Sequence, residues 1–283
     1  MTPQQYCEHQ VLREGSSLYY SLRFLPAAQR QAITALNAFF QEVSDIRYEC
    51  RDANVAQIKW QWWQNQIAET FAESAQHPVC QALSKPIRDY QLAQHYFQEI
   101  IDGLLLDNEK THYATFEELE SYCRRTGGVL SLLMTQVLGY QNDSTLKYAE
   151  QLGIALQLTR LLRQIRRDLE HGRVYLAEEE LARFNVDQQS LFNYQTTETT
   201  QALFAYQAIR IRDYFNNALN FLGKEDRYRQ RSGLIRAELA MATLQEIEND
   251  GFQLFKHDIH LTPMRKLWIA WRTGGLARWQ RIS

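Results

Sequence analysis

Arginine side chains crowd one short segment in the second half of the chain. Residues 160–168 read R-L-L-R-Q-I-R-R-D, which gives four arginines, one aspartate and a net charge of +3. A guanidinium group binds phosphate through paired hydrogen bonds, so this segment suits an anionic ligand. A second segment, residues 41–49, reads Q-E-V-S-D-I-R-Y-E and carries a net charge of −2. Of its acids, Asp45 and Glu49 lie one helical turn apart, the spacing that places two carboxylates on the same side of a helix.

Helical periodicity places some of these groups on one stripe, formed by Gln157, Arg160, Gln164 and Asp168. An apolar stripe runs beside it, formed by Ile154, Leu158, Leu162, Ile165 and Leu169. Charges inside a bundle must pair or bind something. Two interpretations follow. Either the polar stripe lines a cavity that holds a ligand, or the arginines lie on a solvated face and Asp45, Glu49 and Asp168 are their ion-pair partners.

The C-terminal stretch, residues 264–282, is basic and rich in tryptophan. It contains five basic residues and no acid, and Trp268, Trp271 and Trp279 lie among them. The basic residues are Arg265, Lys266, Arg272, Arg278 and Arg281. Such a helix suits the surface of a membrane with anionic lipids. The alternative is a final helix that packs its tryptophans on the core, and we favour that one because amphipathic core helices are far more common.

Helices must position these groups. Apolar spacing predicts helices over residues 26–50, 55–75, 122–138, 146–170, 198–222 and 233–250, and a last one after Pro263. Thr115 begins T-F-E-E, a cap for a helix that starts there. Gly and Pro are scarce, at 12 and 5 residues, and no linker or fixed repeat interrupts the pattern. The prediction is one all-α domain spanning residues 1–283.

Composition narrows the function classes. The net charge of −2 gives no drive toward nucleic acid. No run of 18 apolar residues occurs, and the start of the chain lacks a secretory pattern. The four cysteines are widely spaced, which is typical of free thiols in a cytoplasmic protein. We therefore expect a cytoplasmic protein. The basic C-terminal stretch would also allow a peripheral position on the inner membrane.

Motifs along nearly the whole chain carry a family resemblance. They are Y-Y-S at 19–21, F-L-P at 24–26, A-L-N-A-F-F-Q-E-V-S-D-I-R-Y-E at 35–49, W-W-Q-N-Q-I-A at 62–68 and L-G-I-A-L-Q-L-T-R-L-L-R-Q-I-R-R-D-L-E-H-G-R-V-Y-L at 152–176. In order and spacing the chain resembles the squalene/phytoene synthase family, and within it the presqualene diphosphate synthases of bacterial hopanoid pathways. The resemblance implies an isoprenoid synthase-type helical bundle around a central cavity. It also implies condensation of two prenyl diphosphates, with Mg²⁺ held by carboxylates from two facing helices.

The acidic motifs of the family are depleted in this chain. Ser44 and Tyr48 stand where the family has aspartates, and Asn37 and Gln41 replace a tyrosine and an arginine. The second motif normally reads N-I-L-R-D-V-G-E-D, against R-L-L-R-Q-I-R-R-D here. Outside these motifs, Ser131 replaces a glycine and Ala240 a tyrosine. Together the two motif windows become seven charge units more positive, which opposes a cluster of Mg²⁺ ions.

The resemblance nevertheless implies which residues would form a site. Those for substrate binding are Ser17, Tyr20, Tyr122, Gln157, Arg160, Arg163 and Arg167. Those that could hold one weakly bound metal ion are Asp45, Glu49 and Asp168.

Two functions stay open. The favoured one is a catalytically degenerate member that binds a prenyl diphosphate or another anionic lipid-like ligand without a metal cofactor, alone or with a paralogous synthase as partner. The alternative is an active, Mg²⁺-dependent transferase that joins two farnesyl diphosphates head to head in hopanoid or carotenoid biosynthesis. An interaction protein with a collapsed cavity is a third, weaker reading.

Overall fold

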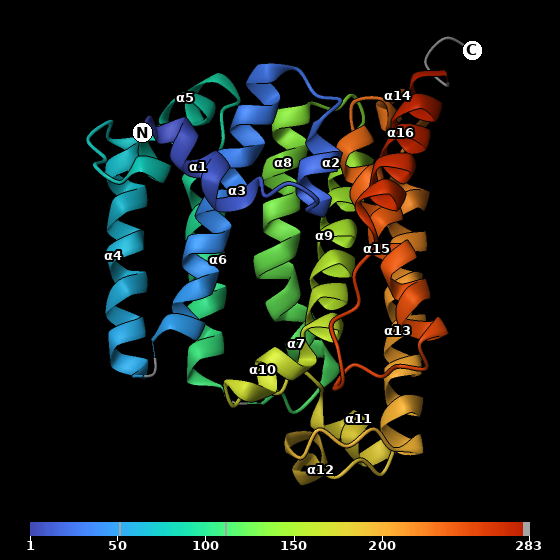
Figure 1. The fold of residues 1–283 in the computed structure, drawn as a ribbon. Coiled ribbons are helices and arrows are strands. Elements are labelled where there is room, and N and C mark those ends of the chain that lie inside the picture. The colour runs from blue at the N-terminus through green and yellow to red at the C-terminus, as the bar shows by residue number, and fades with distance from the viewer. Residues whose placement is uncertain (51, 111, 280–283) are drawn as a thin grey trace.

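The computed structural model describes residues 1–50, 52–110 and 112–279, with the side chains of residues 276–279 left out. Long helices stand side by side along one direction, and short helices close the ends of the bundle (Figure 1). The first half contains α1 (Pro3–Val11), α2 (Ser17–Leu22), α3 (Ala27–Glu49), α4 (Ala53–Phe71), α5 (Pro78–Asp89), α6 (Gln94–Glu109), α7 (Phe116–Cys123), the π-helical turn η1 (Arg124–Gly128) and α8 (Val129–Leu138). The second half contains α9 (Ser144–Arg163), α10 (Ile165–Glu170), α11 (Glu178–Arg183), α12 (Gln188–Phe192), α13 (Glu198–Phe221), α14 (Lys224–Arg227), α15 (Arg231–Asn249) and α16 (Pro263–Trp279). These ranges contain no β-strand beyond one isolated bridge between Tyr113 and Ala177.

The predicted all-α, single-domain architecture is confirmed. The helices predicted over 26–50, 55–75, 198–222, 233–250 and after Pro263 correspond to α3, α4, α13, α15 and α16. The Thr115 side chain caps α7 by accepting a hydrogen bond of 3.3 Å from the backbone N–H of Glu118. None of the described helices is long and apolar enough to cross a membrane.

Two predicted helices are interrupted. The stretch predicted as one helix over 146–170 breaks at Gln164, whose φ of −98° and ψ of 14° separate α9 from α10. The apolar pattern runs unbroken through this kink because Ile165 and Leu169 are both buried beyond it, so periodicity gave no sign of the break. The predicted 122–138 helix contains η1, a one-turn π-helix between α7 and α8.

Two glycines bring η1 against α9. A Cβ atom on Gly153 would lie 2.2 Å from the carbonyl oxygen of Gly127, and one on Gly127 would lie 2.5 Å from the carbonyl oxygen of Gly153. Only hydrogen atoms fit between the two backbones at this point. The close approach fixes α9 next to the α7–α8 segment, and α9 carries the arginine-rich segment.

We expect Gly153→Ala to destabilise the protein, because its methyl group meets backbone atoms that cannot move aside. The free energy of unfolding, measured by urea denaturation, should fall by about 1–3 kcal/mol. Gly275→Ala in α16 is the matched control, since nothing lies within 4 Å of a Cβ there. Equal stability of the two variants would show that the Gly127–Gly153 contact does not constrain the bundle.

Candidate functional site

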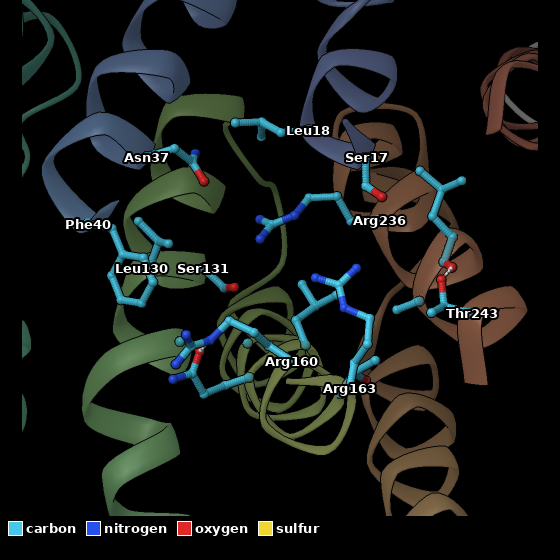
Figure 2. Close-up of a pocket in the computed structure, with 17 residues that line it drawn as sticks. Ser17, Leu18, Asn37, Phe40, Leu130, Ser131, Arg160, Arg163, Arg236 and Thr243 are labelled. Carbon is cyan, nitrogen blue, oxygen red and sulfur yellow. Dashed lines mark hydrogen bonds between the residues drawn. The ribbon is translucent and has the colours of Figure 1, made fainter. Parts of the chain in front are cut away.

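A cavity of about 260 Å³ lies inside the bundle, between α2, α3, η1–α8, α9 and α15. Helices α3 and α9 face each other across it, as expected from the sequence (Figure 2). Its polar and small lining residues are Ser17, Asn37, Gly127, Ser131, Gly153, Gln157, Thr159, Arg160, Arg163, Arg236 and Thr243. Its apolar lining residues are Leu18, Phe40, Leu130, Leu156, Leu239 and Ala240.

Three arginines from two helices converge on this cavity. Arg160 and Arg163 come from the last turn of α9, and Arg236 comes from α15, which packs against α9 (Figure 2). None of the described lining residues carries a carboxylate. Burial lowers the pKa of Arg163, and the positive charge of Arg160 lowers it further. Burial also lowers the pKa of Arg236, to about 10. Burial therefore disfavours the charged forms of Arg163 and Arg236 in the ligand-free protein.

Several donors in this cavity lack partners. The Gln157 side chain is 4 % exposed, yet its Nε2 has no hydrogen-bond acceptor among the described residues, and neither does Nη2 of Arg160. The remaining contacts of Arg160 are long, at 3.3 Å from Nε to Oε1 of Gln157 and 3.3 Å from Nη1 to Oε1 of Gln164. The Arg236 Nη1 donates to the weak acceptor Sδ of Met134, at 3.0 Å. Buried donors of this kind are normally satisfied, so these atoms have unused hydrogen-bonding capacity that faces the cavity.

A fourth arginine lies outside the cavity, buried near the end of α3. Arg47 is 4 % exposed, and its Nη1 donates to the hydroxyls of Tyr122 at 2.6 Å and Tyr175 at 2.8 Å. Its Nη1 also lies 3.6 Å from Oδ2 of Asp107, a carboxylate that is 2 % exposed. Asp107 in turn accepts hydrogen bonds from Tyr113 and Tyr175, at 2.6 and 2.7 Å. We call Arg47, Asp107, Tyr113, Tyr122 and Tyr175 the Arg47 cluster.

The residues expected to hold a metal ion have other partners. Asp168 is 1 % exposed, and its Oδ1 accepts a hydrogen bond of 2.6 Å from the hydroxyl of Tyr48. That hydroxyl accepts one of 2.7 Å from Nη2 of Arg47, so Asp168 is linked to the Arg47 cluster. Glu49 points outward and pairs with Lys59 at 3.3 Å. Burial raises the pKa of Asp45, while the charge of Arg167 opposes that shift.

These residues do not fit the Mg²⁺ site that the resemblance implies. No three His, Cys, Asp or Glu side chains in the described ranges form a group that could hold a metal ion. Tyr48 occupies one former carboxylate position and binds the surviving carboxylate of Asp168, and the charges of Arg47 and Arg160 act on that same group. An octahedral cation needs carboxylate and phosphate oxygens, and it meets guanidinium groups here instead.

The structure brings together only part of the predicted substrate-binding set. Ser17, Gln157, Arg160 and Arg163 line the cavity. Three others, Tyr20, Tyr122 and Arg167, are absent from its described lining.

Each of the three has a different environment. Tyr20 is buried in a small apolar cluster with residues of α15 and α16. Tyr122 belongs to the Arg47 cluster and stacks on Tyr175. Arg167 is exposed, with its guanidinium carbon 4.2 Å from the centre of the Tyr48 ring. Because the kink at Gln164 ends α9, the spacing of seven residues from Arg160 does not keep Arg167 on the cavity side.

Sequence reasoning missed Arg236 and the role of Asp107. Arg236 lies one turn before Ala240, already recognised as the position of a family tyrosine, so the shared helix face was a usable signal. Asp107 lies in the last turn of α6, which ends at Glu109, and it is buried. No local pattern identifies Asp107 as the partner of Arg47, 60 residues away in the sequence.

Relatives with known names match most of the chain. A 15-cis-phytoene synthase from Synechococcus elongatus is 28 % identical over 276 residues, covering 92 % of this chain and 89 % of the relative. A phytoene synthase from Mycobacterium tuberculosis is 30 % identical over 261 residues, covering 84 % of this chain and 83 % of the relative.

Solved structures share the fold. A dehydrosqualene synthase in complex with a ligand superposes with a TM-score of 0.84 at 22 % identity, covering 98 % of this chain and 96 % of that one. The squalene synthase HpnC from Alicyclobacillus acidocaldarius gives a TM-score of 0.76 at 21 % identity, over 88 % and 94 % of the two chains. The sequence model of squalene/phytoene synthases matches residues 11–265. The chain therefore belongs to the squalene/phytoene synthase family.

Proposed function

We propose that this protein binds a prenyl diphosphate, or a similar anionic lipid-like molecule, through arginine side chains in place of Mg²⁺, and that it does not release diphosphate. The observation that carries the proposal is the convergence of Arg160, Arg163 and Arg236 in one cavity whose described lining has no carboxylate. The unpartnered donors of Gln157 and Arg160 support it, because they add hydrogen-bonding capacity at the same place.

The cavity suits an amphiphile. Its leucine side chains, with Phe40 and Ala240, offer an apolar wall for a hydrocarbon chain, and the arginines offer charge for a phosphate head. Ala240 and Asn37 stand where the resemblance has tyrosines, so this chain changes the wall as well as the polar end. A ligand with a charged head and an apolar tail satisfies both parts at once.

Binding by arginines gives the protein affinity for a diphosphate but does not accelerate the release of that diphosphate. A fixed guanidinium group attracts the diphosphate in the ground state as well as in the transition state, and such uniform binding does not accelerate bond cleavage. The carboxylates that would bring Mg²⁺ to the leaving group are replaced or engaged elsewhere, as with Ser44 and Asp168. The protein would then act as a binding or assembly protein in isoprenoid biosynthesis, alone or with a paralogous synthase.

An active transferase is the second candidate. It is favoured by the similarity of the chain to proteins named phytoene synthases. In that case the chain would join two farnesyl diphosphates in hopanoid or carotenoid biosynthesis with an altered Mg²⁺ site. The two candidates differ in whether metal is needed for binding and whether diphosphate is released.

The first test concerns metal-free binding. We expect the wild-type protein to bind farnesyl thiodiphosphate in the presence of EDTA. We expect Arg163→Met to weaken this binding by about 1.5–3 kcal/mol, because a charged hydrogen bond to the head group is lost. Isothermal titration calorimetry measures both. Arg124→Met is the matched control, since Arg124 is exposed and pairs with Glu120 and Glu150.

The Arg163→Met variant also shows whether a loss of binding reflects a loss of folding. Burial and Arg160 disfavour the charge of Arg163, so Arg163→Met should keep or raise the thermal midpoint of the ligand-free protein. Loss of binding with an unchanged or higher midpoint would support the role of Arg163. Affinity equal to wild type, or binding that requires Mg²⁺, would contradict it.

The second test concerns turnover. We expect no diphosphate release above background when the purified wild-type protein is incubated with farnesyl or geranylgeranyl diphosphate and Mg²⁺. A phytoene synthase with complete acidic motifs, assayed in parallel by an enzyme-coupled diphosphate assay, is the positive control. Robust Mg²⁺-dependent release by this protein would overturn the proposal and establish the active transferase.

A further inference from the structure

Helix α16 presents a second apolar face to the outside. Met264, Leu267, Trp268 and Trp271 are 83, 43, 54 and 66 % exposed, and their spacing places them on one stripe. The opposite side of the helix carries Ile269 and Ala270, which are buried in the apolar cluster with α15. The favoured arrangement, in which the tryptophans pack on the core, is therefore wrong for Trp268 and Trp271. The side chain of Trp279 lies outside the described residues.

Basic side chains border this face. Within the described side chains of α16 these are Arg265 and Arg272, whereas Lys266 lies on the inward side with Ile269 and Ala270. The sequence of α16 contains no acid. Arg265 and Arg272 form exposed ion pairs with Glu246 and Glu238 of α15. Such pairs contribute little to stability, so both arginines are available to another anion. The side chain of Arg278, and the whole of Arg281, lie outside the described residues.

The face lies beside the cavity. Helix α16 packs on α15 and α2, and both of those helices contribute lining residues such as Arg236 and Ser17. The Lys266 ammonium donates to the carbonyl oxygen of Gly15 at 2.7 Å, just before α2. Burial lowers the pKa of Lys266, and the charge of Arg163 in the cavity lowers it further, which places the two basic groups near each other.

We propose that the exposed face of α16 docks on the surface of a bilayer that contains anionic phospholipids. Tryptophan rings favour the boundary between head groups and acyl chains, where an apolar body and a polar N–H are both accommodated. Arginine side chains bordering such rings bind lipid phosphates. Trp268 and Arg272 already form such a unit, with the guanidinium carbon 4.8 Å from the ring centre.

An anionic bilayer fits the charges of the α16 face better than a protein surface of arbitrary composition does. The exposed face offers four apolar side chains bordered by Arg265 and Arg272, and α16 itself contributes no acid, a combination that complements an anionic interface. Docked in this way, the protein would hold the α2–α15 wall of its cavity toward the bilayer. The inference does not depend on which ligand the cavity binds.

Vesicle flotation tests the proposal. We expect the full-length wild-type protein to float with vesicles of phosphatidylcholine and phosphatidylglycerol, and to bind at least about tenfold more weakly to phosphatidylcholine alone or at high salt. The double variant Trp268→Ser, Trp271→Ser should lose at least about tenfold in binding to the anionic vesicles. Its tryptophans are exposed, so the thermal midpoint should be unchanged.

The matched control is Ile58→Ser, Trp62→Ser on α4, at the other edge of the bundle (Figure 1). Those side chains are also exposed, at 65 and 44 %. The control should float like wild type. Equal flotation of the α16 variant and wild type would overturn the proposal. So would failure of the wild type to bind anionic vesicles, or a lipid-free dimer that the α16 substitutions disperse.

Discussion

A positive charge buried inside the bundle constrains much of the structure around it. Arg47 lies almost wholly out of water, and leaving such a charge uncompensated would destabilise a protein by about 3–5 kcal/mol. Its compensation comes from Tyr122 of α7, from Tyr175 after α10 and from Asp107 of α6. Segments that are distant in sequence are thereby held together at the end of α3. Tyr48, the next residue, extends the chain of hydrogen bonds to Asp168 of α10.

The hydrogen bonds from Arg47 through Tyr48 to Asp168 lie where the acidic motifs of the family would lie. Tyr48 binds the carboxylate of Asp168, and the guanidinium groups of Arg47 and Arg160 act on it as well. The cavity beyond is left with three arginines and no carboxylate among its described lining residues. Burial, and secondly the charge of Arg160, lower the pKa of Arg163, so its charged form costs stability in the ligand-free protein. Residues that break the rules of stability in this way are expected at functional sites, and an anionic ligand would restore the balance.

Much of the fold was accessible from the sequence, because apolar residues at helical spacing require a helix and few turn-forming residues interrupt them. The polar stripe of α9 was also accessible as far as Arg163. The prediction failed beyond Gln164, because Ile165 and Leu169 continue the apolar pattern through the kink that carries Arg167 to the surface. Arg236 could have been found, because it shares a helix face with Ala240. Asp107 required knowledge of which helices meet, because tertiary pairing leaves no local pattern. The exposure of Trp268 and Trp271 was misjudged for a similar reason. Ile269 and Ala270 suffice to dock α16, and composition alone does not tell which apolar side of a helix is buried.

The most direct measurement is a crystal structure of the protein grown with farnesyl thiodiphosphate in the presence of Mg²⁺. We expect the diphosphate oxygens within hydrogen-bonding distance of the guanidinium groups of Arg160, Arg163 and Arg236, with no cation between the ligand and Asp168. Mg²⁺ bridging the diphosphate to Asp45 or Asp168, with the arginines turned away, would contradict the claim that guanidinium groups have taken over the role of the metal.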